Sequence, residues 1–332
     1  MAPGYLLSSG EIKKYFVNEA ELWGRFNYVF SNSCAKRSTY KFGLVKAILD
    51  NLLAAQTSSK GMELSYLLLF TKFAENYWNI VTKYHLKQMR PDGKSEFTKL
   101  ERLFNTITDQ NAISCQIAFE NLVENDRNYI IAEISKECRK NVVGALYNDF
   151  DGLLYGFELK GSGIWINPIA YEFMLKYKME IEQLNYYAWA RFMEKINDDD
   201  ALRHVLRDLE LSTPKRQNLS IYRQILQEEF EECNCFYCGK KLRSSSHVDH
   251  VIPWTFIKSD HLWNFVLACP TCNTRKNDTL PNKADLSRLI TRNEHYLHSQ
   301  NTVVQEEFAA YNADLLWSIW DYAKLSGFKV SK

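Results

Sequence analysis

The 332-residue sequence lacks the features that mark several classes of protein. It starts without the basic residues and apolar core of a signal peptide, and it has no apolar stretch long enough to span a membrane. It contains no internal repeat and no low-complexity tract, and its 46% hydrophobic and 24% charged residues exclude a fibrous or disordered chain. We therefore expect a soluble, cytoplasmic, globular protein of two or three domains, with no membrane contact.

The sequence also has little net charge, at +1, which does not by itself indicate a nucleic-acid partner. The basic residues are concentrated near the C-terminus, because Cys233 to Arg292 contains nine Lys or Arg against four Asp. Phosphate contact requires such local positive charge, since neutralising phosphates and releasing their counterions supplies most non-specific affinity. A solvated loop surface would produce the same pattern.

Helical periodicity dominates the first 230 residues. Apolar residues recur at helical spacing in six segments, which we expect to be helices: 11–30, 40–55, 62–88, 95–108, 116–125 and 129–147. From Leu153 to Ile166 the pattern changes to alternation around a glycine-rich turn, which predicts a β-hairpin. Asn167 followed by Pro168 is typical of the start of a helix, here one that continues to about Asn197.

The order of these elements permits a winged-helix domain, in which the hairpin would lie along DNA, although core packing explains the aromatic residues more simply. Breaks at 198–200 and 211–214 precede a helix that ends near Glu232, so we place a domain boundary near residue 230. A helix follows Pro281, and a closing helix is expected from Val303 to Leu325. Three parts result: a mainly helical target-recognition, sensing or regulatory domain (1–230), a small zinc-containing α+β domain (231–292), and a C-terminal helix packed on the body (293–332).

The cysteines are unevenly distributed, since five of the eight lie between Cys233 and Cys272 and the others are scattered as single thiols. Two Cys-x-x-Cys turns stand out, and each places two sulfur atoms at the separation that a tetrahedral zinc ion requires. Cys233 lies two residues too early for such a turn, so we do not expect it to be a zinc ligand. We therefore predict a structural Zn²⁺ site that provides much of the local folding free energy, with four ligands: Cys235, Cys238, Cys269 and Cys272.

The residues between these cysteines resemble the ββα-metal motif of the HNH endonucleases. The matching stretches are Val248-Asp249-His250-Val251-Ile252-Pro253, Asn264-Phe265-Val266-Leu267 and Cys272-Asn273 to Lys276. The spacing is especially similar to the HNH domain of the CRISPR RNA-guided nucleases, which lack these cysteines. The resemblance covers about residues 233–285, and it implies a fold class that is mainly α with a small ββα-metal domain near the C-terminus.

The resemblance implies a role for each polar residue of the motif. His250 would be the general base, because a neutral imidazole accepts a proton from water near neutral pH. Asn264 would orient that imidazole. Asp249 and Asn273 would hold one Mg²⁺ or Mn²⁺ through hard oxygen atoms and leave positions for water and a phosphate oxygen.

The surrounding polar residues are less specific. Arg275 and Lys276 would contact phosphate groups. His247 would lie beside the metal or bind phosphate, or it would complete a Cys₂His₂ zinc site with His250, although four cysteines already satisfy zinc. His261 is expected in a solvent-exposed loop. The two asparagines also have simpler interpretations as a turn cap and a helix cap.

The resemblance therefore implies an HNH endonuclease that hydrolyses DNA phosphodiester bonds and leaves a 5′-phosphate and a 3′-hydroxyl, with a role in restriction or anti-phage defence by analogy with the family. One alternative is a zinc module that binds nucleic acid without catalysis. The other is an RNA-directed nuclease or toxin, in which the aromatic residues would provide stacking surfaces. The sequence does not indicate the target, a partner subunit or the oligomeric state.

Overall fold

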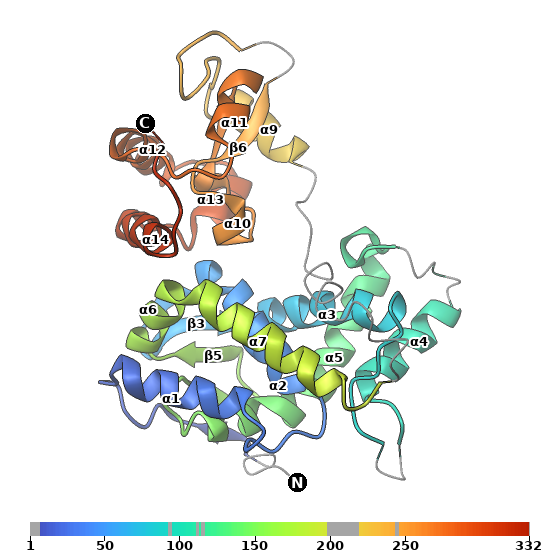
Figure 1. Ribbon diagram of the computed structural model, residues 1–332. Coiled ribbons are helices and arrows are strands. Elements are labelled where there is room, and N and C mark those ends of the chain that lie inside the picture. Colours follow the sequence, from blue (N-terminus) through green and yellow to red (C-terminus); the bar gives the residue numbers. More distant parts are fainter. Residues whose placement is uncertain are drawn as a thin grey trace. The chain divides into compact units, whose positions relative to one another are not determined.

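The computed structural model describes residues 7–91, 95–110, 113, 117–197, 219–242 and 246–331. The chain divides into two compact units, which comprise residues 1–214 (unit 1) and 215–332 (unit 2) and which are both drawn in Figure 1. The breaks expected at 198–200 and 211–214 lie outside the described residues. None of the described helices is long and apolar enough to cross a lipid bilayer.

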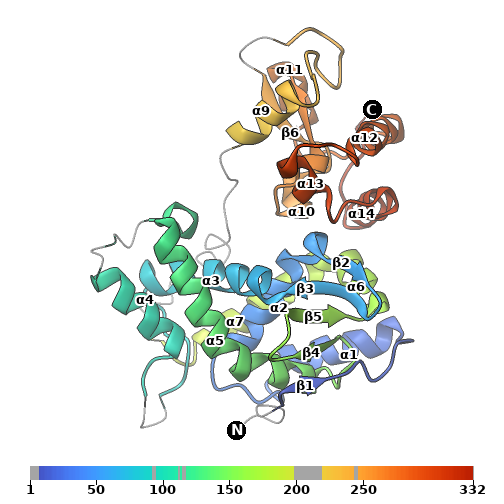
Figure 2. The same cartoon turned by 180° about the vertical axis from the view of Figure 1, so that it is seen from behind.

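Unit 1 contains a five-stranded antiparallel sheet with the order β1-β4-β5-β3-β2, and Figure 2 shows the strands side by side. The strands are β1 (Ser9–Gly10), β2 (Gln56–Ser58), β3 (Gly61–Ser65), β4 (Tyr155–Glu158) and β5 (Gly163–Ile166). The hairpin expected over 153–166 is confirmed as β4 and β5. Both strands are paired on both sides, so the hairpin is part of the sheet interior and the winged-helix alternative is wrong.

The helices of unit 1 pack around α2, which contacts α3, α5 and α7 (Figure 1). Every residue of α2 from Tyr40 to Leu49 is buried, as expected of a helix at the centre of a core. The helices are α1 (Glu19–Phe30), α2 (Tyr40–Asp50), α3 (Tyr66–Thr82), α4 (Lys99–Gln110), α5 (Glu124–Asp149), α6 (Pro168–Lys176) and α7 (Lys178–Met193), with short 3₁₀ turns at Leu52–Ala54 and Phe119–Asn121.

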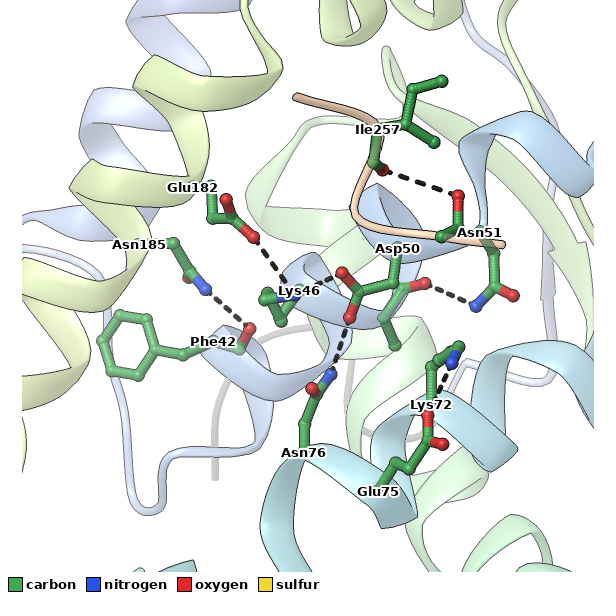
Figure 3. Close-up of polar contacts among 12 residues, drawn as sticks. Phe42, Lys46, Asp50, Asn51, Lys72, Glu75, Asn76, Glu182, Asn185 and Ile257 are labelled. Atoms are coloured by element: carbon green, nitrogen blue, oxygen red, sulfur yellow. Dashed lines mark hydrogen bonds and ion pairs between the residues drawn. The ribbon is translucent and has the colours of Figure 1, made fainter. Parts of the chain in front are cut away.

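The burial of α2 places the charged residue Lys46 inside this core, where it is 1% exposed. Its Nζ pairs with Asp50 one turn later and lies 3.1 Å from Oε1 of Glu182 on α7, while Asn76 on α3 donates to Asp50 Oδ2 at 3.0 Å (Figure 3). Burial alone would lower the pKa of Lys46, but the facing carboxylates outweigh it and raise this pKa well above its usual value. The ion pairs therefore connect α2 to α7, and the Asn76 hydrogen bond connects α2 to α3.

The first expected helix is present but shorter, because α1 begins at Glu19 and not at residue 11. Asn18 caps it: the Asn18 side chain accepts a hydrogen bond from the Glu21 N–H, and the Glu21 carboxylate accepts one from the Asn18 N–H. This capping box fixes the start of the helix, and the start expected at residue 11 is wrong.

Three other expected helices differ in part from the structure. The segment 62–88 begins as β3, because residues 62–65 pair with β5, and only its second part is the helix α3. Among its described residues, segment 116–125 contains a 3₁₀ turn and only the first two residues of α5. The helix expected from Asn167 to Asn197 has the predicted cap at Asn167, but Tyr177 separates it into α6 and α7.

Unit 2 is built around two antiparallel strands, with Asp249 opposite Val266 and His250 opposite Phe265. Its elements are α9 (Ser220–Glu228), β6 (His247–His250), α10 (Trp254–Ile257), a 3₁₀ turn (Leu262–Asn264), β7 (Phe265–Ala268), α11 (Pro270–Lys276), α12 (Lys283–Tyr296), α13 (Thr302–Phe308) and α14 (Ala313–Leu325). Because α9 packs on both strands, the unit starts upstream of the boundary expected near residue 230. The closing helix expected from Val303 is divided into α13 and α14.

Candidate functional site

Four cysteines meet at one point in unit 2. The Sγ atoms of Cys235, Cys238, Cys269 and Cys272 all lie within 4.8 Å of one another, and those of Cys238 and Cys269 are 3.9 Å apart. Four sulfur ligands at the Zn–S distance from one ion would be about 3.8 Å apart at tetrahedral corners. No histidine belongs to this group among the described residues, and Cys233 is exposed outside it. The cluster is therefore arranged to hold a metal ion through four sulfur atoms.

The backbone around Cys235 favours the thiolate form. The Cys269 N–H donates to the Cys235 Sγ at 3.3 Å, and the Gly239 N–H donates to the Cys235 carbonyl at 2.8 Å, which closes the turn with Gly239 at a φ of +71°. Burial raises the pKa of Cys235, but N–H donors from Cys269, Cys238 and Tyr237 outweigh it and hold the pKa at about 7. A metal ion needs thiolate ligands, so these donors prepare the site for one.

A second group of polar residues lies where β6 faces α11. His247 and Asp249 are two residues apart and share one face of the strand, while Asn273 and Lys276 are three residues apart and share one face of the helix. The two faces are in register: Asn273 Nδ2 is 3.0 Å from His247 Nδ1, and Lys276 Nζ is 3.5 Å from Asp249 Oδ2. The structure thus brings Asp249 and Asn273 into neighbouring positions.

The donor atoms on this face suit a hard divalent cation. Within the described chain, Asp249 Oδ1 and the side-chain oxygen of Asn273 have no hydrogen-bond partner. Carboxylate and amide oxygens are the ligands that Mg²⁺ and Mn²⁺ prefer. Asn273 is the fourth residue of α11, and Cys269 occupies the N-cap position, so the alternative interpretation of Asn273 as the helix cap is wrong.

Tyr237 connects the cysteine cluster to this face. It lies between Cys235 and Cys238, and its hydroxyl donates to Asp249 Oδ2 at 2.5 Å. Burial raises the pKa of Tyr237 well above its usual value, and the Asp249 carboxylate raises it further, so the phenol remains a hydrogen-bond donor at neutral pH.

His250, the last residue of β6, points to the opposite side of the strand from Asp249. It is 5% exposed, its ring lies edge-on to Phe265 with centres 4.6 Å apart, and its Nε2 is 2.8 Å from Asp260 Oδ1. The side chain of His250 has no hydrogen bond to Asp249 or Asn273 within the described residues. The structure therefore gives His250 a carboxylate partner that the sequence analysis did not identify.

Asn264 is fully buried and holds the chain immediately after His250. Its Oδ1 accepts from the Ile252 N–H and its Nδ2 donates to the Ile252 carbonyl, both at 2.9 Å. The Asn264 carbonyl also accepts from the Val251 N–H at 2.9 Å. Asn264 thus binds the backbone two residues after His250, and Asp260 is the residue that forms a hydrogen bond with the imidazole.

The residues expected to contact phosphate are in different environments. Arg275 is exposed, with Nη2 3.8 Å from the Cys272 Sγ. Lys276 is buried, and its Nζ donates to the His250 carbonyl at 2.7 Å, so it joins α11 to β6. His261, expected to be exposed, is half-buried and stacks on Trp263 with ring centres 4.6 Å apart.

The basic surplus between Cys233 and Arg292 is also partly internal. Arg292 pairs with Glu232 at 2.7 Å and donates to the Phe265 carbonyl at 2.5 Å, which supports β7. Lys240, Lys241 and Lys283 remain exposed, while Arg243 lies outside the described residues. The exposed positive surface of this unit is therefore smaller than the sequence suggests.

Sequence reasoning missed Asp260 and Tyr237. Asp260 is one of only four acidic residues between Cys233 and Arg292, and this scarcity is the one sequence signal that could have identified it. Its position ten residues after His250 follows no simple period. Tyr237 occupies a variable position of a Cys-x-x-Cys turn, where a tyrosine has no evident role until the fold places it against Asp249.

Comparison with known proteins supports the resemblance for this part of the chain. Residues 235–279 match the family model described as HNH endonuclease, while no match is found among curated proteins or solved structures. The matched segment contains the cysteine cluster, Asp249, His250 and Asn273. The expected fold class, mainly helical with a small domain of this type near the C-terminus, is confirmed. Residues 235–279 therefore form an HNH endonuclease domain with a four-cysteine site for a metal ion.

Proposed function

We propose that this protein is a metal-dependent endonuclease that hydrolyses DNA phosphodiester bonds, leaving a 5′-phosphate and a 3′-hydroxyl. The observation that carries the proposal is the register between β6 and α11, which brings Asp249 and Asn273 together in a segment that matches the HNH endonucleases. A module that only binds nucleic acid would not need a carboxylate and an amide oxygen left without protein partners, so a catalytic role is favoured.

In this proposal Asp249 and Asn273 hold one Mg²⁺ or Mn²⁺ ion. Such a cation stabilises negative charge on the phosphate and on the leaving 3′ oxygen. The Tyr237 hydroxyl donates a hydrogen bond to Asp249 Oδ2, and Lys276 Nζ lies 3.5 Å from the same oxygen atom. These two contacts fix the carboxylate and leave Oδ1 for the cation. His247, 3.0 Å from the Asn273 amide, holds that amide in position.

His250 is the proposed general base, and Asp260 is its orienting partner. The 2.8 Å contact supports an Nε2–H that donates to the Asp260 carboxylate, so that Nδ1 carries the lone pair that accepts a proton from water. Nδ1 has no hydrogen-bond partner within the described residues. Asn264 supports this arrangement by fixing the backbone at Ile252.

Zinc is the proposed occupant of the cysteine cluster, because four thiolates in tetrahedral arrangement form a closed structural site with no position for a substrate. The cluster would then hold Tyr237, and through Tyr237 it would hold Asp249. Zinc and the catalytic cation therefore have separate roles: zinc maintains the fold of the site, and the second ion takes part in the chemistry.

A single assay tests the proposal. The protein is incubated with supercoiled plasmid, linear duplex DNA, single-stranded DNA and RNA, each with Mg²⁺, Mn²⁺ or EDTA. We expect cleavage of DNA that requires a divalent cation, and an anti-phage or restriction role predicts activity on double-stranded DNA. Cleavage of RNA alone would favour the RNA-directed alternative.

His250→Ala is the central variant of this assay. It should abolish cleavage while folding, metal content and DNA binding persist, because the side chain lies outside the cysteine cluster. His298→Ala, which replaces an exposed histidine in the same unit, is the matched control and should keep full activity. Cleavage by His250→Ala above the background of a mock preparation would refute His250 as the base.

A further inference from the structure

Unit 1 contains a cavity of about 1370 Å³, larger than the roughly 300–1000 Å³ of typical small-molecule sites. Its walls come from the end of α1 and residues 31–38 after it, the start of α2, residues 89–90 and 95–98, the start of α4, and the second halves of α5 and α7. All of these elements belong to unit 1. The cavity is therefore a separate feature from the HNH domain, and a ligand bound in it would not depend on the proposed nuclease activity.

The walls of the cavity carry charge of one sign. Among the described residues that line it, nine are Lys or Arg and none is Asp or Glu. Four of these nine cations form ion pairs with carboxylates that do not line the cavity. Asp149 pairs with Lys41, Glu137 with Lys99 and Lys140, and Glu194 with Arg191. Within the described chain, four others have no carboxylate partner: Lys36, Arg90, Arg102 and Lys195. The protein thus leaves an excess of positive charge in this cavity.

Neutral oxygen atoms hold these cations in place without cancelling their charge. Lys36 Nζ donates to the Ser31 carbonyl at 2.8 Å, and Lys195 Nζ donates to Asn32 Oδ1 at 2.8 Å. Burial lowers the pKa of Lys36, and the positive charge of Lys41 also lowers it, as expected for a cation that is partly removed from water beside a second cation. A bound anion would provide a counter-charge.

Aromatic rings alternate with the cations along the lining. Phe97 and Tyr187 are 38% and 59% exposed, which leaves flat apolar surface open to a ligand. The Arg90 guanidinium lies 5.7 Å from the centre of the Phe192 ring, so a planar cation and a ring are already in contact. Exposed rings beside Lys and Arg are the combination that binds unpaired nucleobases and their phosphates.

We propose that this cavity binds a short single-stranded oligonucleotide, with its phosphates against the Lys and Arg residues and with bases stacked on Phe97 and Tyr187. A duplex fits this chemistry poorly, because its bases are already stacked and present no free faces. An acidic peptide would satisfy the charge but not the exposed rings. The size of the cavity, beyond that of a single small-molecule site, indicates more than one nucleotide.

The ligand has two possible sources that share this chemistry, namely an unpaired segment of a longer nucleic acid and a free short oligonucleotide. Binding is measured with the full-length protein by fluorescence anisotropy in EDTA, which prevents metal-dependent cleavage. The probes are 5′-labelled dT₆, the same six nucleotides as a single-stranded segment flanked by duplex, a labelled dT₂, and a labelled DNA hairpin with a fully paired stem as the paired control. Preference for the flanked probe indicates the first source, and equal or tighter binding of the free short probes indicates the second.

The charge contribution is tested with two lysines on α5. Lys140 lines the cavity, and Lys136, one turn earlier, does not. Each is exposed and pairs with a glutamate three residues before it, at 3.4 Å and 3.5 Å respectively. Lys140→Gln should weaken dT₆ binding about three- to tenfold and lower the slope of log affinity against log salt by about 0.7, whereas Lys136→Gln should change neither.

The stacking contribution is tested with two exposed tyrosines. Tyr187→Ala removes a ring from the cavity, while Tyr129→Ala removes a ring of similar exposure, 55%, from a surface outside it. Tyr187→Ala should weaken dT₆ binding at least about fivefold and leave binding of a base-free deoxyribose-phosphate hexamer unchanged. Tyr129→Ala should bind both probes as the unmodified protein does.

Two results would overturn the proposal. Equal affinities for Lys140→Gln and Lys136→Gln, with both variants folded by circular dichroism, would place the binding elsewhere on the chain. Equal affinity for dT₆, the base-free hexamer and a poly-glutamate peptide of the same charge would show that the cavity attracts any polyanion and does not recognise nucleotides.

Discussion

The Tyr237 hydroxyl donates to Asp249 Oδ2 at 2.5 Å, and this bond joins the cysteine cluster to the proposed cation site of unit 2. Tyr237 stands between two cysteines of the cluster, and Asp249 is a proposed ligand of the catalytic cation. An ordered cysteine cluster therefore keeps the Asp249 carboxylate in one orientation. Loss of the metal from the cluster should disturb the catalytic face even though no cysteine belongs to it.

The first prediction tests this bond directly. Tyr237→Phe removes one hydroxyl and should leave the metal content of the cysteine cluster intact. Because residues that orient metal ligands typically contribute 10- to 100-fold to affinity or activity, the concentration of Mg²⁺ or Mn²⁺ needed for half-maximal cleavage should rise by about that factor. Tyr296→Phe, whose ring stacks on Phe230, is the control and should match the unmodified protein. An unchanged metal requirement for Tyr237→Phe would show that Lys276 alone orients Asp249.

The second prediction concerns the cysteine cluster. Cys238→Ser or Cys272→Ser should abolish bound zinc and cleavage together, because a site with three sulfur ligands no longer supports the fold of the domain. Zinc is measured by atomic absorption on protein purified without added metal. Cys233→Ser replaces the exposed cysteine outside the cluster and should keep both properties. Full zinc occupancy in either cluster variant would contradict the four-cysteine assignment.

The features that could be predicted from the sequence are those set by local spacing. The two Cys-x-x-Cys turns, the cap at Asn167 and the hairpin over 153–166 each depend on residues a few positions apart, and the structure contains all three. The capping box at Asn18 is equally local, because it depends on the Asn-x-x-Glu spacing of the sequence. The prediction that this helix starts at residue 11 did not take that spacing into account.

The features that escaped prediction depend on contacts between distant parts of the chain. Residues 62–65 form a strand because they pair with β5, about a hundred residues later, and a pattern within one window does not reveal such a partner. The same reason explains Asp260. The chain turns back through α10 before it reaches the His250 ring, so only the folded structure brings the two side chains together.

The third prediction concerns this His250 partner. Asp260→Asn keeps the size of the side chain but removes the charge that favours an Nε2–H tautomer, so the cleavage rate should fall about 10- to 100-fold without loss of DNA binding or zinc. Asp278→Asn, an exposed acid in the same domain, is the control. An Asp260→Asn enzyme with an unchanged cleavage rate would remove Asp260 from the mechanism.

The fourth prediction concerns the stability of unit 1. Lys46→Met removes the cation that pairs with the buried carboxylates of Asp50 and Glu182, and breaking such a pair typically costs about 3–5 kcal/mol. The free energy of unfolding is measured with urea at pH 7. Lys13→Met removes an exposed ion pair with Asp151 and should cost less than about 1 kcal/mol. If Lys46→Met lowered the free energy of unfolding as little as the control does, the Lys46 ion pairs would not hold the helices together.

The same ion pairs predict how stability depends on pH. The folded pKa of Lys46 is raised well above 10.5, so its contribution is fully present below pH 10.5, the ordinary value, and is lost as the pH rises above it toward the folded pKa. The unfolded chain releases this proton first, and stability therefore falls with increasing pH. Unfolding measured in steps from pH 9 to more alkaline solution should show a steeper decline for the unmodified protein than for Lys46→Met. Parallel declines would mean that Lys46 does not retain its proton in the folded core.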